Sequence, residues 1–436
     1  MPNGVITALL SVPALKRLLI RDFACNSDTE MKLASKMVQN RGKKHHCLYI
    51  TYDGLLDPLG KTQILPYLAG LARAGYRFTI LSFEKADRDP ARIQALKHDL
   101  EVQGISWVHL PFKRGRFQGV LRMLHGSRVV RRIARHDPFA LAHMRTIVPA
   151  VIYAFSLPNK PFIYDIRAFS GQWVDGGRIS NTSFAYLFLA TLERLLIRWA
   201  AGLVVLDQSG ADHLRAMYKP RQPLRVIPTS TDLTAYPQSH SIKPILRDEP
   251  LRFVFLGGAR FPYLPYEALK FVKGLVGFGC ECRIDFINER DHDQVRQAVQ
   301  RASFPVERLA LFSLAADEVH RQLGSYDCGL VFIADGPWIR MSSPTKIGEY
   351  LAAGLHVVGL SGIAALDRLA AESSCVDVLE RSSSGCGLLS ADQAADLVTR
   401  LRAPKRPFAA RHLAQKYYDL NQAINQYVDL YQQVLS

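Results

Sequence analysis

The sequence predicts an α/β protein with two doubly wound, Rossmann-like domains, each built on a parallel β-sheet. Short apolar runs, typical of strands buried on both faces, alternate along the chain with longer segments of helical periodicity. A segment rich in proline, serine and threonine, residues 229–249, interrupts this alternation. The chain has 436 residues, enough for two buried cores, and its apolar fraction of 48% is typical of globular proteins.

The predicted order is an N-terminal extension over residues 1–45, a first domain over 46–228, a linker over 229–249, a second domain over 250–405 and a closing helix over 406–436. Residues 5–20 of the extension are apolar, contain two basic residues and lack a small-residue cleavage site. We therefore expect a weak amphipathic helix there rather than a signal peptide.

In the first domain, apolar runs predict strands at Cys47–Tyr52, Phe78–Phe83, Ile105–Leu110, Leu141–Arg145, residues 162–167, Gly202–Leu206 and Leu224–Ile227. Helical periodicity predicts helices at residues 63–74, 89–102, 148–157, 184–200 and 208–218.

The second domain repeats the pattern, with strands predicted at Phe253–Leu256, Cys282–Ile287, Leu309–Phe312, Gly329–Ile333 and His356–Leu360. A last helix is predicted over Leu413–Leu435, because seven apolar or aromatic residues form one stripe along it: Leu413, Tyr417, Leu420, Ile424, Tyr427, Val428 and Tyr431.

Residues 342–354, with the sequence SSPTKIGEYLAAG, predict a loop, a helix start and a glycine stop. Pro344 suits the first helical turn, where a missing N–H costs nothing. Ile347, Tyr350 and Leu351 fall on one helical face, and Gly354 supplies a left-handed residue that ends the helix.

The start of this helix offers groups that bind an anion: free backbone N–H groups, the Thr345 hydroxyl and the Lys346 ammonium. Glu349, one turn further on, has a carboxylate that can hold two neighbouring hydroxyls of a ribose. The alternative is a capped helix whose Lys346 and Glu349 face water.

The loop after the first strand contains Gly60-Lys61-Thr62, the end of a phosphate-binding Walker A loop. A Walker A loop needs four residues between its first glycine and the Gly-Lys-Thr, whereas five separate Gly54 from Gly60. A P-loop ATPase with Asp165 or Asp207 as the magnesium-binding acid stays open as an alternative. Two D-x-D matches, Asp87–Asp89 and Asp291–Asp293, are expected by chance in charged loops.

The formal charge of +16 indicates anionic partners. Lys113–Arg135 contains eight basic residues and no acid, with apolar residues at helical spacing. Such an element is typical of a helix that lies on an anionic membrane surface, and its alternative is a solvated face over an ordinary core stripe. No stacking platform of interleaved aromatics appears, which argues against nucleic acid.

These motifs together resemble the retaining, nucleotide-sugar-dependent glycosyltransferases of family 4, which have the two-domain GT-B fold. The family carries two glutamates with seven residues between them. Glu349 matches the second, but Met341 occupies the position of the first. A subgroup of the family, associated with surface polysaccharide biosynthesis, carries a Pro-Thr-Lys before the second glutamate, and Pro344-Thr345-Lys346 resembles that motif. Because Met341 lacks a carboxylate, the resemblance implies a different mode of sugar recognition or, alternatively, an inactive relative that acts as a binding protein.

Further matches to the subgroup lie in the first loop, at the Asp-x-Arg of the strand at 162–167 and at a downstream Asp-Gly: Gly60, Gln63, Leu65, Pro66, Asp165, Arg167, Asp175 and Gly176. The resemblance covers roughly residues 46–436. It implies two domains that face each other across a cleft and a C-terminal helix that crosses back to the first domain.

The resemblance also implies roles for individual residues. The catalytic group comprises His143, Lys346 and Arg260, and the donor is bound by Gly257, Gly258, Ser343, Pro344, Thr345 and Glu349. The acceptor is bound by Asp53, Gly60, Asp165 and Arg167. Without the resemblance, we would interpret His143 as a core residue. Asp165 and Arg167 would be interpreted equally well as a structural ion pair or as groups that orient the hydroxyls of an acceptor.

The expected reaction transfers a sugar, of hexosyltransferase type, from a nucleoside diphosphate sugar with UDP or GDP to a hydroxyl of a glycan or lipid-linked acceptor. We expect no metal and no cofactor, because cations and a helix N-terminus take their place. We further expect a cytoplasmic protein that attaches peripherally to the inner face of the membrane through Lys113–Arg135 and that binds no nucleic acid.

Overall fold

The computed structural model describes residues 45–436 except 86, 113–117, 157–159, 237–248, 383–384, 387–388 and 404–405. The predicted N-terminal extension therefore lies outside the described residues. The chain forms two compact units. Unit 1 contains the chain up to Val205, His213–Arg225 and Ile424–Ser436, and unit 2 contains Leu206–Asp212 and Val226–Ala423.

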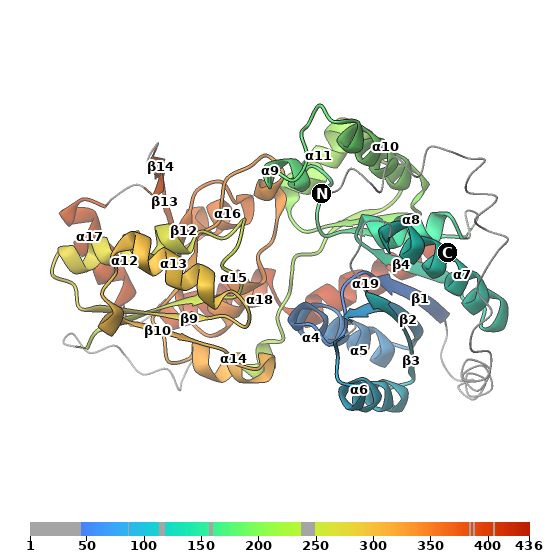
Figure 1. The fold of residues 1–436 in the computed structure, drawn as a ribbon, viewed down its shortest axis with the longest axis horizontal. Coiled ribbons are helices and arrows are strands. Elements are labelled where there is room, and N and C mark those ends of the chain that lie inside the picture. Colours follow the sequence, from blue (N-terminus) through green and yellow to red (C-terminus); the bar gives the residue numbers. More distant parts are fainter. Residues whose placement is uncertain are drawn as a thin grey trace. The chain divides into compact units, whose positions relative to one another are not determined.

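Unit 1 is built on a seven-stranded sheet with the strand order β3-β2-β1-β4-β5-β6-β7 (Figure 1). Neighbouring strands from β3 through β6 all pair in parallel. The strands are β1 (His45–Thr51), β2 (Tyr76–Lys85), β3 (Ile105–Phe112), β4 (Leu141–Arg145), β5 (Phe162–Ile166), β6 (Gly202–Val205) and β7 (Leu224–Val226).

The helices that connect these strands are α4 (Pro58–Gln63), α5 (Leu65–Arg73), α6 (Pro90–Val102), α7 (Gln118–His136), α8 (Ile147–Ala154), α9 (Gln172–Asp175), α10 (Phe184–Trp199) and α11 (Gln208–Tyr218). The strand order reverses between β1 and β4. In open α/β sheets, ligands bind outside the carboxyl ends of the strands at such a reversal. The residues after β1, β4 and β5 are therefore placed where a ligand is expected.

Unit 2 is built on a six-stranded sheet with the order β10-β9-β8-β11-β12-β13 and parallel pairings throughout. Its strands are β8 (Leu251–Leu256), β9 (Cys282–Ile287), β10 (Leu309–Phe312), β11 (Cys328–Val331), β12 (His356–Leu360) and β13 (Val376–Leu379), with a small hairpin of β14 (Arg381–Ser382) and β15 (Gly385–Cys386). The predicted strands all appear, whereas β13 was not predicted.

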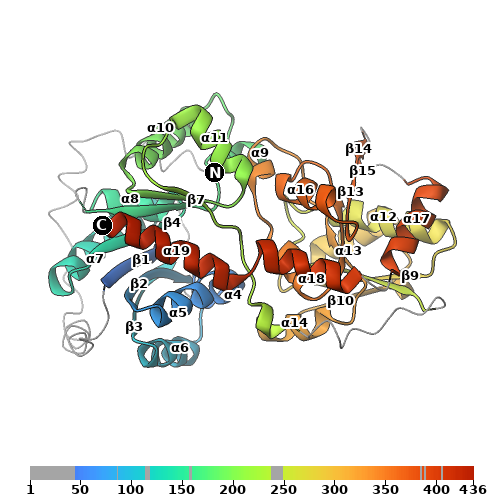
Figure 2. The same cartoon turned by 180° about the vertical axis from the view of Figure 1, so that it is seen from behind.

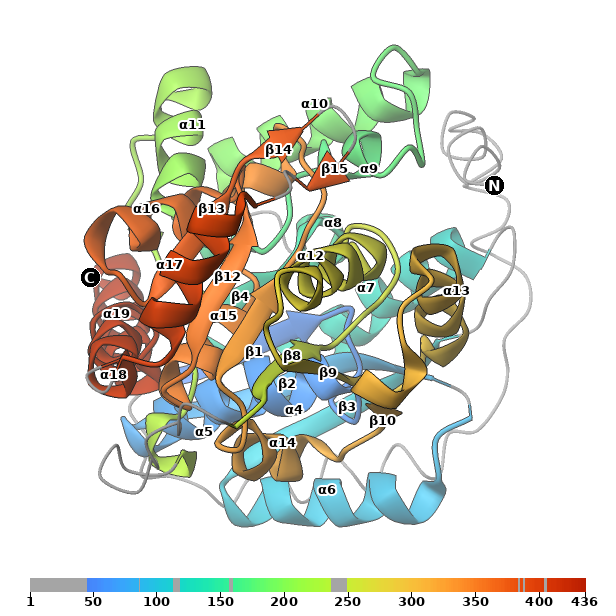
Figure 3. The same cartoon turned by 90° about the vertical axis from the view of Figure 1, so that its left-hand side faces the viewer.

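The helices of unit 2 are α12 (Pro265–Gly277), α13 (His292–Ala302), α14 (Ala316–Leu323), α15 (Thr345–Ala352), α16 (Ala364–Glu372), α17 (Ala391–Leu401) and α18 (Arg406–Tyr417), with short 3-10 turns η2 (Leu233–Ala235), η4 (Val306–Arg308) and η5 (Ile339–Met341). Figure 3 shows helices on both faces of the sheet. Two cores result, because alternate β8 residues point to opposite faces: Phe253 and Phe255 pack into one core and Val254 into the other.

The predicted last helix, Leu413–Leu435, is two helices, α18 and α19 (Leu420–Leu435), separated at Tyr418–Asp419. The backbone of Thr231 causes the break, since its N–H donates to Tyr418 O (2.7 Å) and its O accepts from Leu420 N (3.1 Å). The predicted stripe is thus shared: Leu413 packs in unit 2, whereas α19 packs on the sheet of unit 1 (Figure 2). Gly202 permits this contact, since a Cβ there would lie 3.1 Å from Leu430.

The predicted linker, 229–249, is integrated into unit 2 where it is described. Thr229 donates its hydroxyl to Ser343 O (2.8 Å), and residues 229–231 are buried. Residues 237–248 lie outside the described part of the chain.

Candidate functional site

The first candidate site, here called the Lys346 site, lies in unit 2 and consists of Gly257–Arg260, Lys346 and Glu349. Strand β8 ends at Gly257, whose φ of +91° favours glycine. Its N–H donates to Ile287 O (2.9 Å), and its O accepts from the Asn288 side chain (2.7 Å). The turn after β8 is therefore held at the carboxyl edge of the sheet.

Asp291 fixes the rest of this turn. Its carboxylate accepts from Ala259 N (3.1 Å) and from Arg260 Nε (2.7 Å). The Arg260 side chain is 67% exposed, so it remains accessible while one edge is held. Asp291 belongs to a D-x-D match that could not be selected from local pattern, because its partners lie about thirty residues away in the chain.

Helix α15 carries the second half of the site. It begins at Thr345 with Pro344 as N-cap, one residue later than predicted, and Gly354 follows it with φ +78° as predicted. The Tyr350 hydroxyl accepts from Leu256 N (2.8 Å), and its ring occupies space that only a glycine at position 329 leaves open. These contacts fix the start of α15 against the end of β8.

Lys346 is the central group. Its side chain is buried, and its Nζ has no hydrogen-bond partner among the described residues. The Nζ lies 4.4 Å from the ring centre of Phe255 and 4.2 Å from that of Tyr263, and 4.0 Å from where a Cβ would be at Gly257. Burial lowers the pKa of Lys346 to about 7, although the Glu349 carboxylate opposes this shift. Desolvation thus outweighs the attraction of the Glu349 carboxylate.

Glu349 follows one turn later on α15 and is only partly exposed. Burial raises the pKa of Glu349 to about 7, and Lys346 counteracts the rise. Burial raises the pKa values of Tyr236 and Tyr263, and the negative charge of Glu349 raises them further. These three side chains are therefore neighbours. Near pH 7 the site can therefore hold one or both charges, and a bound anion would favour the protonated ammonium of Lys346.

Ser343 and Met341, two positions near α15 singled out in the sequence, are buried and contact other parts of unit 2. Ser343 is buried, and its hydroxyl and carbonyl both contact the Thr229 hydroxyl (3.0 and 2.8 Å). Met341 is buried in η5 and packs as an apolar side chain. Gly258 lies against Tyr263, where a Cβ would be 3.1 Å from the ring. Pro344 and Thr345 stand, partly exposed, at the helix start.

The second candidate site, here called the Arg145 site, lies in unit 1 and consists of Asp53, His143, Arg145, Asp165 and Arg167. Its acidic centre is Asp165, which accepts from Arg167 Nε (2.9 Å) and contacts His143 Nε2 (3.2 Å). Burial by itself would raise the pKa of Asp165, but Arg167 and His143 together lower it below its ordinary value.

His143 is buried at the centre of β4, with both ring nitrogens engaged. Nδ1 lies 2.7 Å from the Tyr431 hydroxyl of α19, and Nε2 contacts Asp165. Burial lowers the pKa of His143, so the ring is neutral at pH 7. The structure therefore places His143 as a positioning residue for Asp165 rather than at a surface where a sugar could contact it.

Arg145 was noted only as the end of its strand, and its environment is unusual. It is buried, its Nε lies 3.5 Å from Asp53, and its Nε and Nη1 lack hydrogen-bond partners in the described part of the chain. The next residue, Thr146, has φ +75°, a strained value for a β-branched residue. Nη1 of Arg167 likewise lacks a partner. Buried guanidinium donors without partners are costly, so a bound acceptor of hydrogen bonds would be favoured here.

The first loop does not form a P-loop. Gly60-Lys61-Thr62 lies inside helix α4, and a Cβ at Gly60 would be 2.3 Å from Gly54 O, which leaves no space for a phosphate. The N–H of Leu55 donates to Glu84 (2.6 Å) rather than to a ligand. Gly60 allows close backbone packing, and its contact with the acceptor stays a prediction. The P-loop alternative is wrong.

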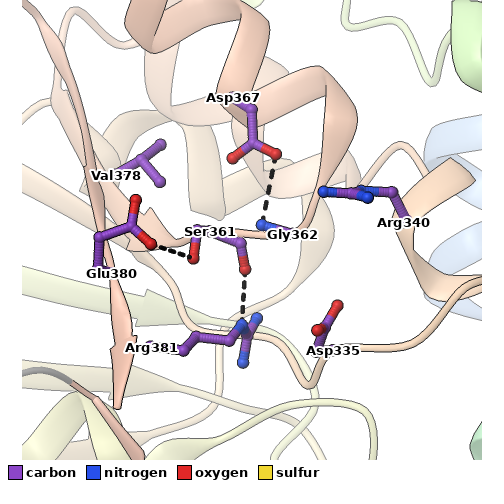
Figure 4. Close-up of a pocket in the computed structure, with 8 residues that line it drawn as sticks. All are labelled: Asp335, Arg340, Ser361, Gly362, Asp367, Val378, Glu380 and Arg381. Carbon is purple, nitrogen blue, oxygen red and sulfur yellow. Dashed lines mark hydrogen bonds between the residues drawn. The ribbon is translucent and has the colours of Figure 1, made fainter.

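A cavity of about 450 Å³ in unit 2 contains none of the predicted site residues (Figure 4). Its lining groups are bonded to one another: Gly362 N to Asp367, Ser361 to Glu380, and Arg381 to Ser361 O. The complete lining is Asp335, Arg340, Ser361, Gly362, Asp367, Val378, Glu380 and Arg381.

Within the described residues, no three His, Cys, Asp or Glu side chains are grouped so that they could hold a metal ion. None of the helices in the described part of the chain is long and apolar enough to span a bilayer.

Two lysines follow Arg260 in sequence, and both have partners elsewhere. Lys270 contacts Glu267 (3.6 Å), and Lys273 donates to Ala302 O (2.8 Å). The cation beside the Gly257 turn is therefore Lys346.

Residues 61–230 match the family described as Glycosyl transferase 4-like domain. Among curated proteins, no sequence is similar enough to count as a relative. Solved structures are similar in fold. Sucrose-phosphate synthase from Thermosynechococcus elongatus superposes with a TM-score of 0.67 at 12% identity and covers 90% of this chain and 99% of its own. WaaG, a glycosyltransferase involved in lipopolysaccharide biosynthesis, gives 0.58 at 14% identity and covers 88% and 99%.

A third structure, from E. coli and described as trehalose-6-phosphate bound with UDP-2-fluoro glucose, gives a TM-score of 0.60 at 11% identity and covers 89% of this chain and 99% of its own. Together with the two parallel-sheet units, these similarities establish the GT-B fold. The family match adds support for a GT-B glycosyltransferase.

Proposed function

We propose that the protein transfers a sugar from a nucleoside diphosphate sugar to a hydroxyl acceptor, with retention of the anomeric configuration. One observation carries the proposal: the buried ammonium of Lys346 has no hydrogen-bond partner among the described residues and lies beside both a glycine turn and a helix start. A diphosphate supplies the negative charge that such a site lacks. Glu349 is placed to hold the ribose, and the base is that of UDP or GDP.

In the proposed reaction, the bond from the anomeric carbon to the diphosphate oxygen breaks, and a bond to the acceptor oxygen forms. The acceptor proton passes to the departing phosphate, so no carboxylate base is needed. Lys346, Arg260 and the first N–H groups of α15 stabilise the charge that develops on the diphosphate. We propose that no metal ion is required. Because Met341 lacks the carboxylate of the family, the sugar itself is recognised by other groups.

The Arg145 site supports an acceptor that carries a phosphate or carboxylate near its reactive hydroxyl. In the part of the chain that the structure describes, Nη1 of Arg145 and Nη1 of Arg167 have no hydrogen-bond partner, and the partly exposed Asp53 lies 3.5 Å from Arg145 Nε. A lipid-linked glycan, as in the assembly of surface polysaccharides, would present such an anion. We therefore place the protein in the cytoplasm, attached peripherally to the inner face of the membrane.

Helix α7 supports this attachment. Its exposed side includes His125, Arg128, Arg131, Arg132 and Arg135, and no residue of α7 is acidic. Arg122, by contrast, turns inward and stacks on Phe112 at 4.4 Å. Residues 113–117 of the predicted basic element lie outside the described residues.

The test of the donor site is thermal unfolding with UDP, GDP, ADP and ATP at millimolar concentration, with magnesium and with EDTA. A nucleotide at a hundredfold excess over its dissociation constant should stabilise the fold by about 2.7 kcal/mol. We expect this shift with UDP or GDP in EDTA. Glu349→Gln should weaken binding roughly tenfold to a hundredfold, because a hydrogen bond to a charged group contributes about 1.5–3 kcal/mol.

A shift that required magnesium, or that survived unchanged in Glu349→Gln, would argue against this site. The inactive relative makes a different prediction, since it would bind nucleotide yet never release it from a donor sugar. Release of UDP or GDP from the matching nucleotide sugar, in the presence of membrane glycolipid extract, separates the two.

A further inference from the structure

Helix α10 exposes an apolar face that the fold does not use. Phe184 is 58% exposed, Leu187 54% and Trp199 58%, and Leu195 is also exposed. At 3.6 residues per turn these four side chains fall within about 120° of the helix circumference. A single exposed apolar residue is ordinary, but four exposed apolar residues on one helical face, two of them large aromatic residues, mark an interaction surface.

The opposite face of α10 holds the helix on unit 1. Leu196 and Ile197 are buried, and so is Glu193, the only acid of the helix. The Glu193 carboxylate accepts from Ser170 N (3.1 Å) and from the Ser170 hydroxyl (2.7 Å). The outward face therefore carries no negative charge. The exposed Thr191 and Arg198 lie within its sector of about 120°, and the exposed Arg194 lies at its edge.

The neighbouring helices continue this character. Helix α8 contacts both α7 and α10, and all three lie in the same region of unit 1 (Figure 1). Phe155, at the end of α8, is exposed, and α7 adds its exposed arginines. Aromatic and aliphatic side chains next to arginines, without acids, match the interface of an anionic bilayer better than the surface of a protein partner.

We propose that α10 inserts Phe184, Leu187, Leu195 and Trp199 into the interfacial region of an anionic phospholipid bilayer, while α7 supplies the electrostatic attraction. Two signals of this kind, apolar burial and charge, together give stable peripheral binding. The inference extends the membrane attachment proposed above and is independent of the sugar chemistry.

The test uses the full chain and vesicles of phosphatidylcholine that contain about 30% phosphatidylglycerol, an anionic lipid. Vesicles of pure phosphatidylcholine serve for comparison. We expect sedimentation with the anionic vesicles and, in the triple variant Phe184→Ser, Leu187→Ser, Trp199→Ser, a loss of binding of about tenfold or more. The control is Val102→Ser, an apolar residue on α6 that is even more exposed (76%). The UDP or GDP shift of the triple variant should be unchanged, so failure here is separable from failure of the proposed function.

Trp199 gives a direct reading of insertion. Vesicles with brominated acyl chains should quench part of the tryptophan fluorescence of the native chain, and Trp199→Phe should remove that part. Unchanged vesicle binding of the triple variant, or quenching that persists in Trp199→Phe, would overturn the proposal. So would a dimer that the triple variant dissociates while vesicle binding is absent, because the face would then belong to a second copy.

The contribution of α7 is tested by Arg128→Gln, Arg132→Gln, Arg135→Gln. We expect this variant to bind anionic vesicles more weakly, and we expect the difference from the native chain to shrink as salt rises. Binding that is equal to that of the native chain at low salt would show that α7 plays no part.

Discussion

Replacing Lys346 by methionine should stabilise the unliganded protein and abolish its stabilisation by nucleotide. The ammonium is buried, and none of the described residues forms a hydrogen bond with it; an unsatisfied buried polar group costs about 1–3 kcal/mol. Methionine fills similar space between Phe255 and Tyr263 without a charge. We expect a gain of about 1–2 kcal/mol at pH 6, which is roughly 2–6 °C in Tm for a unit of this size.

The gain should depend on pH. The pKa of Lys346 is lowered by burial to about 7 from an ordinary value of 10.5, so the folded native chain binds fewer protons than the unfolded chain between these values. Its stability therefore rises with pH from about 7 to 10, as Lys346 loses its charge in the fold. Glu349, with its pKa near 7, is largely protonated at pH 6 and needs no counter-charge there. The advantage of methionine is thus largest at pH 6 and should be clearly smaller at pH 9, because most of the rise in native stability has occurred by then.

Calorimetry or thermal unfolding at pH 6 and pH 9, with and without nucleotide, measures both effects. Lys61→Met is the matched control, since Lys61 is an exposed lysine of the excluded P-loop and should change neither stability nor nucleotide binding. If Lys346→Met keeps the nucleotide shift, the Lys346 site does not bind the diphosphate. If it destabilises the unliganded protein, Lys346 has a structural role that the geometry does not reveal.

Apolar runs predicted every strand of the two sheets except β13, because alternation and burial dominate in parallel sheets. Val376–Leu379 was missed because Asp377 interrupts its apolar run. The break between α18 and α19 was also not predictable, since the apolar stripe continues across Tyr418–Asp419. Its cause is a backbone contact from Thr231, almost two hundred residues earlier in the chain.

The candidate sites were predictable to a similar extent. The helix start at Thr345–Lys346 and the acid at Glu349 follow from local pattern, and the structure brings them beside Gly257. Asp291 could not be selected, because its role depends on a turn brought close by the sheet. The burial of Arg145 is likewise a tertiary property: a strand that ends in an arginine more often points it to water.

The sequence left open whether Asp165 and Arg167 form a structural ion pair, and Arg167→Met distinguishes the possibilities. Removing one partner of a buried pair leaves an uncompensated charge and typically costs about 3–5 kcal/mol. Asp165 would lose its Nε donor and the main opponent of its desolvation. We expect Arg167→Met to be among the most destabilising single substitutions in unit 1.

The loss should grow with pH. In the native chain the pKa of Asp165 is lowered, so its stabilising contribution is present above its ordinary value of 3.8 and is lost only as pH falls further. Without Arg167, burial dominates and the pKa of Asp165 rises. The folded variant then binds more protons than the unfolded chain, and its stability decreases as pH rises from about 4 toward neutrality. Urea unfolding at pH 5 and pH 8 should therefore show the larger loss at pH 8.

The double variant Asp165→Asn, Arg167→Met isolates the pair, because it removes both charges at once. A loss smaller than the sum of the single losses by about 0.5–3 kcal/mol indicates coupling. Arg128→Met, an exposed arginine on α7, should stay within about 0.5 kcal/mol of the native chain. A loss below 1 kcal/mol in Arg167→Met would show that the pair contributes little to stability. The cost of burying these two charges at the carboxyl end of β5 would then be offset only by a ligand, and this result would strengthen the case for an acceptor site.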